Sequence, residues 1–236
     1  MKLYNISIVF FLLCCTGASY AQDIKISSEF KSLIPAGWIP ESQYEGDLNK
    51  DKLEDVVLVL RNTDRKNFVK HDGSGADTLD LNPRRLMILF KTGTGYKKVL
   101  ATDKFLPSVN SEINPCLDDP LFDGGIEIKN GVLKIRHHYW LSCGSWYVTD
   151  YEYTFRYQHN KFELIGLDIS SFHRASGESG FTSYNFSTRK KQVITGMNEF
   201  EEKNNKPVEK WERFSVSKTY DLATIEENTA LEDFVK

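Results

Sequence analysis

The chain has 236 residues, 27% of them charged, and a formal net charge of −3. This slightly acidic balance argues against a nucleic-acid-binding function. Beyond the N-terminal apolar run, no segment reaches the roughly 20 apolar residues that a membrane-spanning helix needs.

The first 21 residues have the pattern of a cleavable secretory signal peptide. Lys2 precedes an apolar run from Ile6 to Cys15, and small residues follow up to Ala21. Cleavage after Ala21 predicts a secreted or periplasmic protein. The alternative is a lipoprotein acylated at Cys14 or Cys15, but the two leucines before Cys14 match that signal poorly.

Residues 22–236 are expected to form a single β-rich domain, because no long Ser-, Pro- or Gly-rich linker divides them. A short N-terminal helix is predicted over Ser28 to Leu33, with its first serine as the cap. Two apolar runs, Val56 to Leu60 and Leu86 to Phe90, are typical of strands buried on both faces. The charged stretch from Arg61 to Arg85 between them is predicted to be a long surface loop.

Strand-like alternation dominates residues 125–169. Apolar and polar residues alternate from Leu133 to Leu141 and again from Tyr147 to Tyr157, and Asn130-Gly131 is a strong hairpin signal. We therefore predict a mainly β fold of antiparallel meander sheets, arranged as a β-sandwich or as a partial propeller. His137 falls on the apolar face and is predicted to be a hydrogen-bonded core histidine.

The C-terminal part continues this pattern. Phe181 to Phe186 and Gln192 to Met197 are predicted to form another hairpin, and Trp211 to Tyr220 a final strand. A charged spacer separates them, from Glu201 to Lys210. We expect the acidic tail, residues 221–236, to be disordered.

Two cysteines remain after the predicted cleavage, Cys116 and Cys143. Disulfides persist in the exported compartments that the signal peptide predicts. Both residues lie in loop-like sequence near the same predicted sheet. The sequence leaves two alternatives open, a disulfide or two buried thiols.

One loop, Gly46 to Asp55, has the spacing of a calcium site. With Asp47 at position 1, side-chain oxygens fall at positions 1, 3, 5 and 9, and a backbone carbonyl is available at position 7. These ligands are Asp47, Asn49, Asp51 and Asp55 with the carbonyl of Leu53. The loop is not an EF-hand, because position 6 is Lys, position 12 is Leu and a strand follows it. The alternative is an ordinary turn in which Asp and Asn bond nearby amides.

A D-x-N-x-D-x-x-x-D loop that leads into an apolar strand resembles the calcium loops of integrin-type FG-GAP repeats (FG-GAP/VCBS-like). The order of features from Ile34 to Ile169 is also similar to that in a family of uncharacterised exported proteins of Gram-negative bacteria. Those features include Ile34-Pro35-Ala36-Gly37-Trp38, Asp119-Pro120-Leu121-Phe122 and Tyr153-Thr154-Phe155-Arg156-Tyr157. The resemblance implies a bound calcium ion with a structural role. FG-GAP proteins repeat the motif around a propeller, whereas here it occurs once.

Two further groups of residues are functional candidates. Trp140 and Trp146 are predicted to share the face opposite the apolar stripe, which suits sugar or peptide binding unless a second layer covers it. The acids Asp118, Asp119 and Asp123 could pair with Glu127 for acid–base chemistry on a glycoside. The simpler interpretation of these acids is a solvated loop.

The sequence therefore favours a secreted, non-catalytic binding or structural module, with calcium as the one implied cofactor and an extracytoplasmic glycan or protein as its ligand. The alternative is a hydrolase that acts on an extracellular polymer through acids around Asp118 to Asp123. Whether the protein is an enzyme stays open on the sequence alone.

The calcium hypothesis predicts a thermal shift. Excess calcium should raise the unfolding midpoint by about 5–11 °C over its value in EDTA, the effect of a ligand at about 100 times its dissociation constant. Asp47→Ala and Asp51→Ala should each abolish the shift. An unchanged wild-type midpoint at millimolar calcium would make the loop an ordinary turn.

Overall fold

The computed structural model describes residues 27–122, 125–201, 206–216, 218–229 and 234. As predicted, the chain is mainly β, with antiparallel sheets and a short helix, α1 (Ser28–Lys31), near the N-terminus. The predicted cleavage site lies outside the described residues. Within the described part of the chain, no helix has both the length and the apolar character to cross a membrane.

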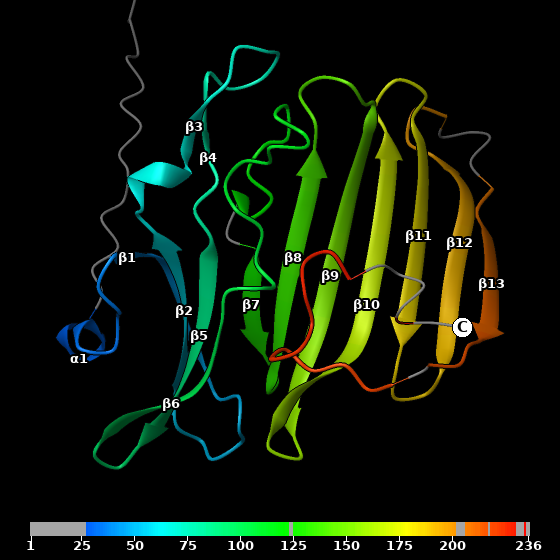
Figure 1. Ribbon diagram of the computed structural model, residues 1–236. Helices are drawn as coiled ribbons and strands as arrows, with labels where there is room; N and C mark the ends of the chain where they lie inside the picture. The colour runs from blue at the N-terminus through cyan, green and yellow to red at the C-terminus, as the bar shows by residue number, and fades with distance from the viewer. Residues whose placement is uncertain (1–26, 123–124, 202–205, 217, 230–233, 235–236) are drawn as a thin grey trace, which may run out of the picture.

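The strands form a four-stranded sheet in the order β1-β2-β5-β6, a seven-stranded sheet in the order β13 to β7, and the small hairpin β3-β4 (Figure 1). The first sheet and the hairpin comprise β1 (Trp38–Gly46), β2 (Asp55–Asn62), the 3-10 turn η1 (Arg65–Asn67), β3 (Phe68–Lys70), β4 (Thr78–Asp80), β5 (Arg84–Thr92) and β6 (Gly95–Thr102). The second sheet comprises β7 (Ile126–Lys129), β8 (Val132–Trp140), β9 (Tyr147–Gln158), β10 (Lys161–His173), β11 (Glu178–Asn185), β12 (Lys190–Asn198) and β13 (Val208–Arg213).

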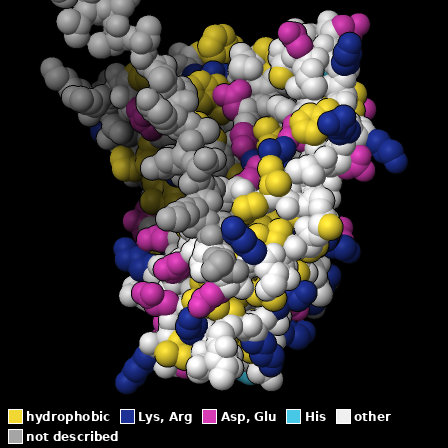
Figure 2. Space-filling model, turned by 90° about the vertical axis from the view of Figure 1, so that its left-hand side faces the viewer, with side chains coloured by type: hydrophobic (Ala, Val, Ile, Leu, Met, Phe, Trp, Pro, Cys, Tyr) yellow, Lys and Arg dark blue, Asp and Glu magenta, His cyan; other side chains and the backbone are white. Residues whose placement is uncertain are grey.

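The four-stranded sheet is buried on both faces at its centre, as its two apolar runs predict. One face of β2 and β5, including Val57 and Ile88, packs in a core with residues of the second sheet such as Leu133 and Phe155. The other face packs against Phe30 of α1. The two sheets thus enclose a common core, which fits the sandwich alternative. On the side seen in Figure 2, acidic and basic side chains are interspersed and neither sign forms a large patch.

The seven-stranded sheet is a meander with tight turns. Asn130 and Gly131 have φ angles of 54° and 72°, and His159 and Asn160 have φ angles of 50° and 59°. Left-handed backbone at both central residues is what a type I′ hairpin turn requires. These turns fix the register, so that odd-numbered residues of β9 face the core and even-numbered ones face outward.

The described part of the C-terminal tail differs from the expected disorder. Leu222 and Ile225 are fully buried in the common core, and Phe234 is buried there too. The segment runs across the face of the second sheet (Figure 1), where the amide of Leu222 donates to the carbonyl of Phe162. Its three apolar side chains explain why an acidic sequence is nevertheless held in place.

The segment from Arg61 to Arg85 is also more ordered than a surface loop. It contains η1 and the β3-β4 hairpin, and Leu79 is buried. The strand β5 already begins at Arg84, whose side chain is buried as well. The sequence pattern did not predict the burial of Arg84, because charged residues are usually exposed. The partners that allow this arginine to be buried lie far away in the chain.

His137 is buried, as predicted, but it is not a hydrogen-bonded histidine. Neither ring nitrogen has a hydrogen-bond partner within the described residues. Its ring packs instead against Phe105 and Tyr153, at centroid distances of 5.0 and 5.4 Å. This burial lowers the pKa of His137 to about 3.

The buried imidazole predicts a pH-dependent loss of stability. Below about pH 6.5, the unfolded chain takes up a proton that folded His137 does not. The stabilising effect is therefore present above pH 6.5 and is lost as the pH falls toward 3. Between about pH 7 and pH 5, the free energy of unfolding of His137→Phe should gain about 2 kcal/mol relative to wild type.

Urea denaturation at the two pH values measures this difference. His71→Gln serves as the control, because His71 lies in the loop between β3 and β4, away from the core. If the difference in the free energy of unfolding between wild type and His137→Phe did not change with pH, the lowered pKa of His137 would be contradicted.

Candidate functional site

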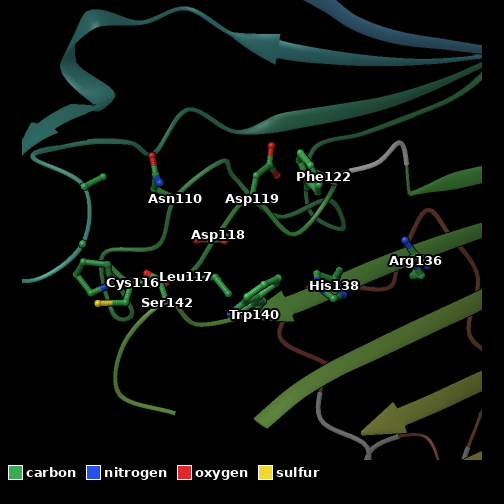
Figure 3. Close-up of a pocket in the computed structure, with 13 residues that line it drawn as sticks. Asn110, Cys116, Leu117, Asp118, Asp119, Phe122, Arg136, His138, Trp140 and Ser142 are labelled. Atoms are coloured by element: carbon green, nitrogen blue, oxygen red, sulfur yellow. The ribbon is translucent and has the colours of Figure 1, made fainter. Parts of the chain in front are cut away.

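A cavity of about 790 Å³ lies on the outer side of β8, and we call it the β8 cavity (Figure 3). It is lined by the outer face of β8, the segment of residues 115–122, loop residues near the tip of the β3-β4 hairpin, and two further loop residues, Asn110 and Ser142. The lining residues are Gly75, Ala76, Asn110, Pro115, Cys116, Leu117, Asp118, Asp119, Phe122, Arg136, His138, Trp140 and Ser142.

One wall of the β8 cavity is the outer face of the strand itself. Strand alternation turns Leu133, Ile135 and His137 into the core, so the residues between them point outward. Figure 3 shows Arg136, His138 and Trp140 in a row along β8. The ring of His138 is oriented by a contact with the neighbouring strand, since its Nδ1 lies 2.8 Å from Oδ1 of Asp150 on β9.

The opposite wall, residues 115–122, is fixed to the edge of β8 by main-chain hydrogen bonds. The amide of Asp118 donates to the carbonyl of Trp140 at 2.9 Å, and the amide of His138 donates to the carbonyl of Pro120 at 2.9 Å. A disulfide joins Cys116 to Cys143 with a Cα–Cα distance of 5.4 Å. Of the two alternatives that the sequence left open, the structure has the disulfide. The position of this wall relative to Trp140 is therefore set by covalent and main-chain contacts.

Asp119 connects this wall to the first sheet through Arg84. Both carboxylate oxygens of Asp119 accept hydrogen bonds from Arg84 at 2.6 Å, and Nε of Arg84 donates to Glu41 at 2.6 Å. Burial alone would lower the pKa of Arg84, but its bonds to Asp119 and Glu41 outweigh burial and raise it. Arg84 therefore stays charged between two carboxylates from β1 and the cavity wall.

The acids that the sequence analysis singled out have unequal surroundings. Asp118 is exposed and lines the β8 cavity, whereas Asp119 is committed to Arg84. Asp123 lies outside the described residues. Glu127 on β7 is also exposed, with Lys129 at 3.8 Å. The acid–base pair of the hydrolase alternative would thus need Asp118 with a partner other than Asp119.

The two predicted aromatic residues are brought together by a third residue. Trp140 lines the β8 cavity and is 41% exposed, and Trp146 is 62% exposed in the loop before β9. The guanidinium carbon of Arg174 lies 5.3 Å from the ring centre of Trp140 and 5.7 Å from that of Trp146. Arg174 was not predicted from the sequence, because it lies in the turn directly after β10, far from both tryptophans along the chain.

The sequence analysis also missed Phe122, which is 72% exposed and lies across the β8 cavity from His138 in Figure 3. Neither Phe122 nor Asn110 belongs to a periodic strand pattern. Both reach the site through loops, and loop positions depend on contacts between distant segments.

Asp55, predicted as a calcium ligand, is turned into the protein at the start of β2. Its buried carboxylate accepts the amides of Leu48 at 2.9 Å, Asn49 at 3.3 Å and Lys91 at 3.0 Å. Burial raises the pKa of Asp55, and these three amides act in the opposite direction. This carboxylate ties the loop to the end of β5, which is a structural role.

The other predicted calcium ligands bond within their own loop. Asp47 accepts the amide of Lys52 at 2.9 Å, and Asp51 accepts the amide of Leu53 and the side-chain amide of Asn49. Across the described ranges, no group of three or more His, Cys, Asp or Glu side chains is placed to hold a metal ion. Calcium binding by this loop stays a prediction, tested by the comparison of EDTA with calcium.

Comparisons with known proteins return no match, whether against protein-family models, curated proteins or solved structures. The resemblance of the 47–55 loop to FG-GAP repeats therefore stays a prediction. Function must be argued from the geometry of the β8 cavity.

The Arg84 contacts predict a large stability effect. Arg84→Met leaves the carboxylate of Asp119 without its cation, whereas Glu41 keeps its ion pair with Arg61 at 2.7 Å. Removing one partner of such a buried ion pair typically lowers the free energy of unfolding by about 3 kcal/mol. Urea denaturation at neutral pH measures the loss.

Lys104→Gln is the matched control, because Lys104 forms an exposed ion pair with Glu226 and its loss should barely change stability. Equal stability of Arg84→Met and wild type would contradict the anchoring role of Arg84.

Proposed function

We propose that the protein is an extracytoplasmic binding module that holds a saccharide in the β8 cavity. The observation that carries this proposal is a half-exposed indole, Trp140, in a cavity that also presents donors and acceptors of both charges. A large concave site with an aromatic wall and a few polar groups is the usual form of a small-ligand site.

The chemistry of the lining suits a polyhydroxylated ligand. The flat apolar face of a sugar ring can stack on Trp140, and its hydroxyl groups both donate and accept hydrogen bonds. Asp118 offers acceptors, Arg136 offers donors, and the side-chain nitrogen of Asn110 offers donors while its oxygen accepts the amide of Asp80 at 2.9 Å. Because Nδ1 of His138 is engaged with Asp150 at 2.8 Å, Nε2 is the ring nitrogen left to bond a ligand.

A peptide that adds as a strand fits this position less well. The edge of β8 beside the cavity is already paired with residues 118–120 through the amides of Asp118 and His138. Strand addition needs unpaired main-chain groups. Such groups belong to the outermost strands of the two large sheets, which are β1, β6, β7 and β13.

Two further observations support the proposal, one concerning the hydrolase alternative and one concerning the compartment. Both oxygens of Asp119 are taken by Arg84, so Asp119 is not free to be the second carboxylate that glycoside hydrolysis by Asp118 needs. The Cys116–Cys143 disulfide is of a kind that persists in oxidising compartments.

Isothermal titration calorimetry with chitohexaose, cellohexaose and maltohexaose tests the proposal. At least one of these neutral saccharides should bind, and Trp140→Ala should weaken that binding by about 30-fold, the effect of truncating an interface Trp hot spot.

Trp211→Ala is the matched control, since Trp211 is 61% exposed on β13, a strand that does not line the β8 cavity. Absence of heat with all three sugars, or equal losses in Trp140→Ala and Trp211→Ala, would overturn the proposal.

A further inference from the structure

We infer that the ligand is a chain rather than a single sugar unit, and that it continues from the β8 cavity onto the indole of Trp146. The inference rests on the proposed saccharide-binding function and names the class of ligand, a linear oligosaccharide or polysaccharide. Trp140 would hold one unit inside the cavity and Trp146 a unit beyond it.

The first observation is the shared contact of the two indoles. Arg174 places its guanidinium within 5.3 Å of the ring centre of Trp140 and 5.7 Å of that of Trp146. Its terminal nitrogen donates to the carbonyls of Leu141 and Ser145, which bracket the loop between the two tryptophans. The two rings are thus neighbours whose separation is fixed by one residue.

The second observation is that Trp146 is held in place although it packs into no core. Its carbonyl accepts the amide of Arg174 at 2.9 Å. Within the same loop, Cys143 is joined to Cys116 by the disulfide, and the amide of Ser142 donates to the carbonyl of Cys116 at 2.8 Å. The main chain that carries Trp146 is thus fixed and Arg174 lies over its ring, which lowers the ordering cost when a ligand stacks on the indole.

The third observation is the position of the two rings relative to the cavity. Trp140 forms part of the cavity wall, whereas Trp146 lies next to it at the start of β9 and 62% exposed. A ligand of one unit would use Trp140 alone and leave Trp146 in water. A chain that leaves the cavity past Trp140 meets Trp146 as the next aromatic surface.

The inference predicts a dependence on chain length that a single-unit site would lack. The probes are the monosaccharides N-acetylglucosamine and glucose and the hexasaccharides of the chito-, cello- and malto-series, measured by calorimetry on the full protein. Wild type should bind a hexasaccharide at least about tenfold more tightly than its monosaccharide, an energy of the size that one aromatic contact contributes.

Trp146→Ala should remove this preference and leave monosaccharide affinity unchanged, whereas Trp140→Ala should weaken the binding of both probes. Trp146→Phe, which keeps a flat ring, should restore part of the preference. Thermal unfolding of each variant confirms that it folds, and Trp211→Ala is the control for loss of an exposed indole.

The outcomes separate the two proposals. Equal affinities for the two lengths, with no effect of Trp146→Ala on either, would overturn the chain inference and leave a single-unit saccharide site standing. No binding of any probe by wild type would overturn the saccharide site and the inference with it.

Discussion

The guanidinium of Arg84 joins the first sheet to the wall of the β8 cavity. It lies between Glu41 of β1 and Asp119 of the 115–122 segment and is buried by both. A buried cation is tolerated only when paired, so Arg84 holds the carboxylate of Asp119 and shares that of Glu41 with Arg61. Asp119 in turn places its neighbours: Asp118 toward the cavity and Phe122 across from β8. The site thus depends on an ion pair of which only Asp119 lines the cavity.

The other restraints on the cavity act on the side of the second sheet. Main-chain hydrogen bonds hold residues 118–120 along the edge of β8, and the disulfide closes the far end at Cys116. Arg174 then fixes the loop that carries Trp146. These contacts fix the main chain on both sides of the two tryptophans, and Arg174 lies over both indoles, so a ligand would meet Trp140 and Trp146 on a fixed backbone.

Period-2 patterns and turn residues predict most of the second sheet, because Asn130-Gly131 and the alternation in β9 are local signals. They fail where a residue's environment is set by distant segments. Arg84 has a surface-loop character in the sequence, and its burial depends on Glu41 and Asp119. The tail is acidic overall, and its order depends on apolar residues such as Leu222 that fill the core. Alternation predicts burial of His137 but not whether its nitrogens find partners.

The same limit applies to the site. The sequence put Trp140 on the outward face and suggested the disulfide as one of two alternatives, and both follow from local patterns and compartment. It also placed the acids near Asp118 together, but it did not indicate that Arg84 would neutralise Asp119. The contact of Arg174 with both indoles depends on the register of β10 against β9. The spacing of residues in the sequence does not determine that register.

The most direct test of the account is a two-dimensional NMR titration that follows the indole N–H signals of the four tryptophans, Trp38, Trp140, Trp146 and Trp211. Chitohexaose, cellohexaose and maltohexaose are added in turn. The account predicts that one of them shifts the signals of Trp140 and Trp146 in a saturable manner and leaves those of Trp38 and Trp211 in place. Saturable shifts confined to Trp211 or Trp38, or no shift with any of the three, would contradict it.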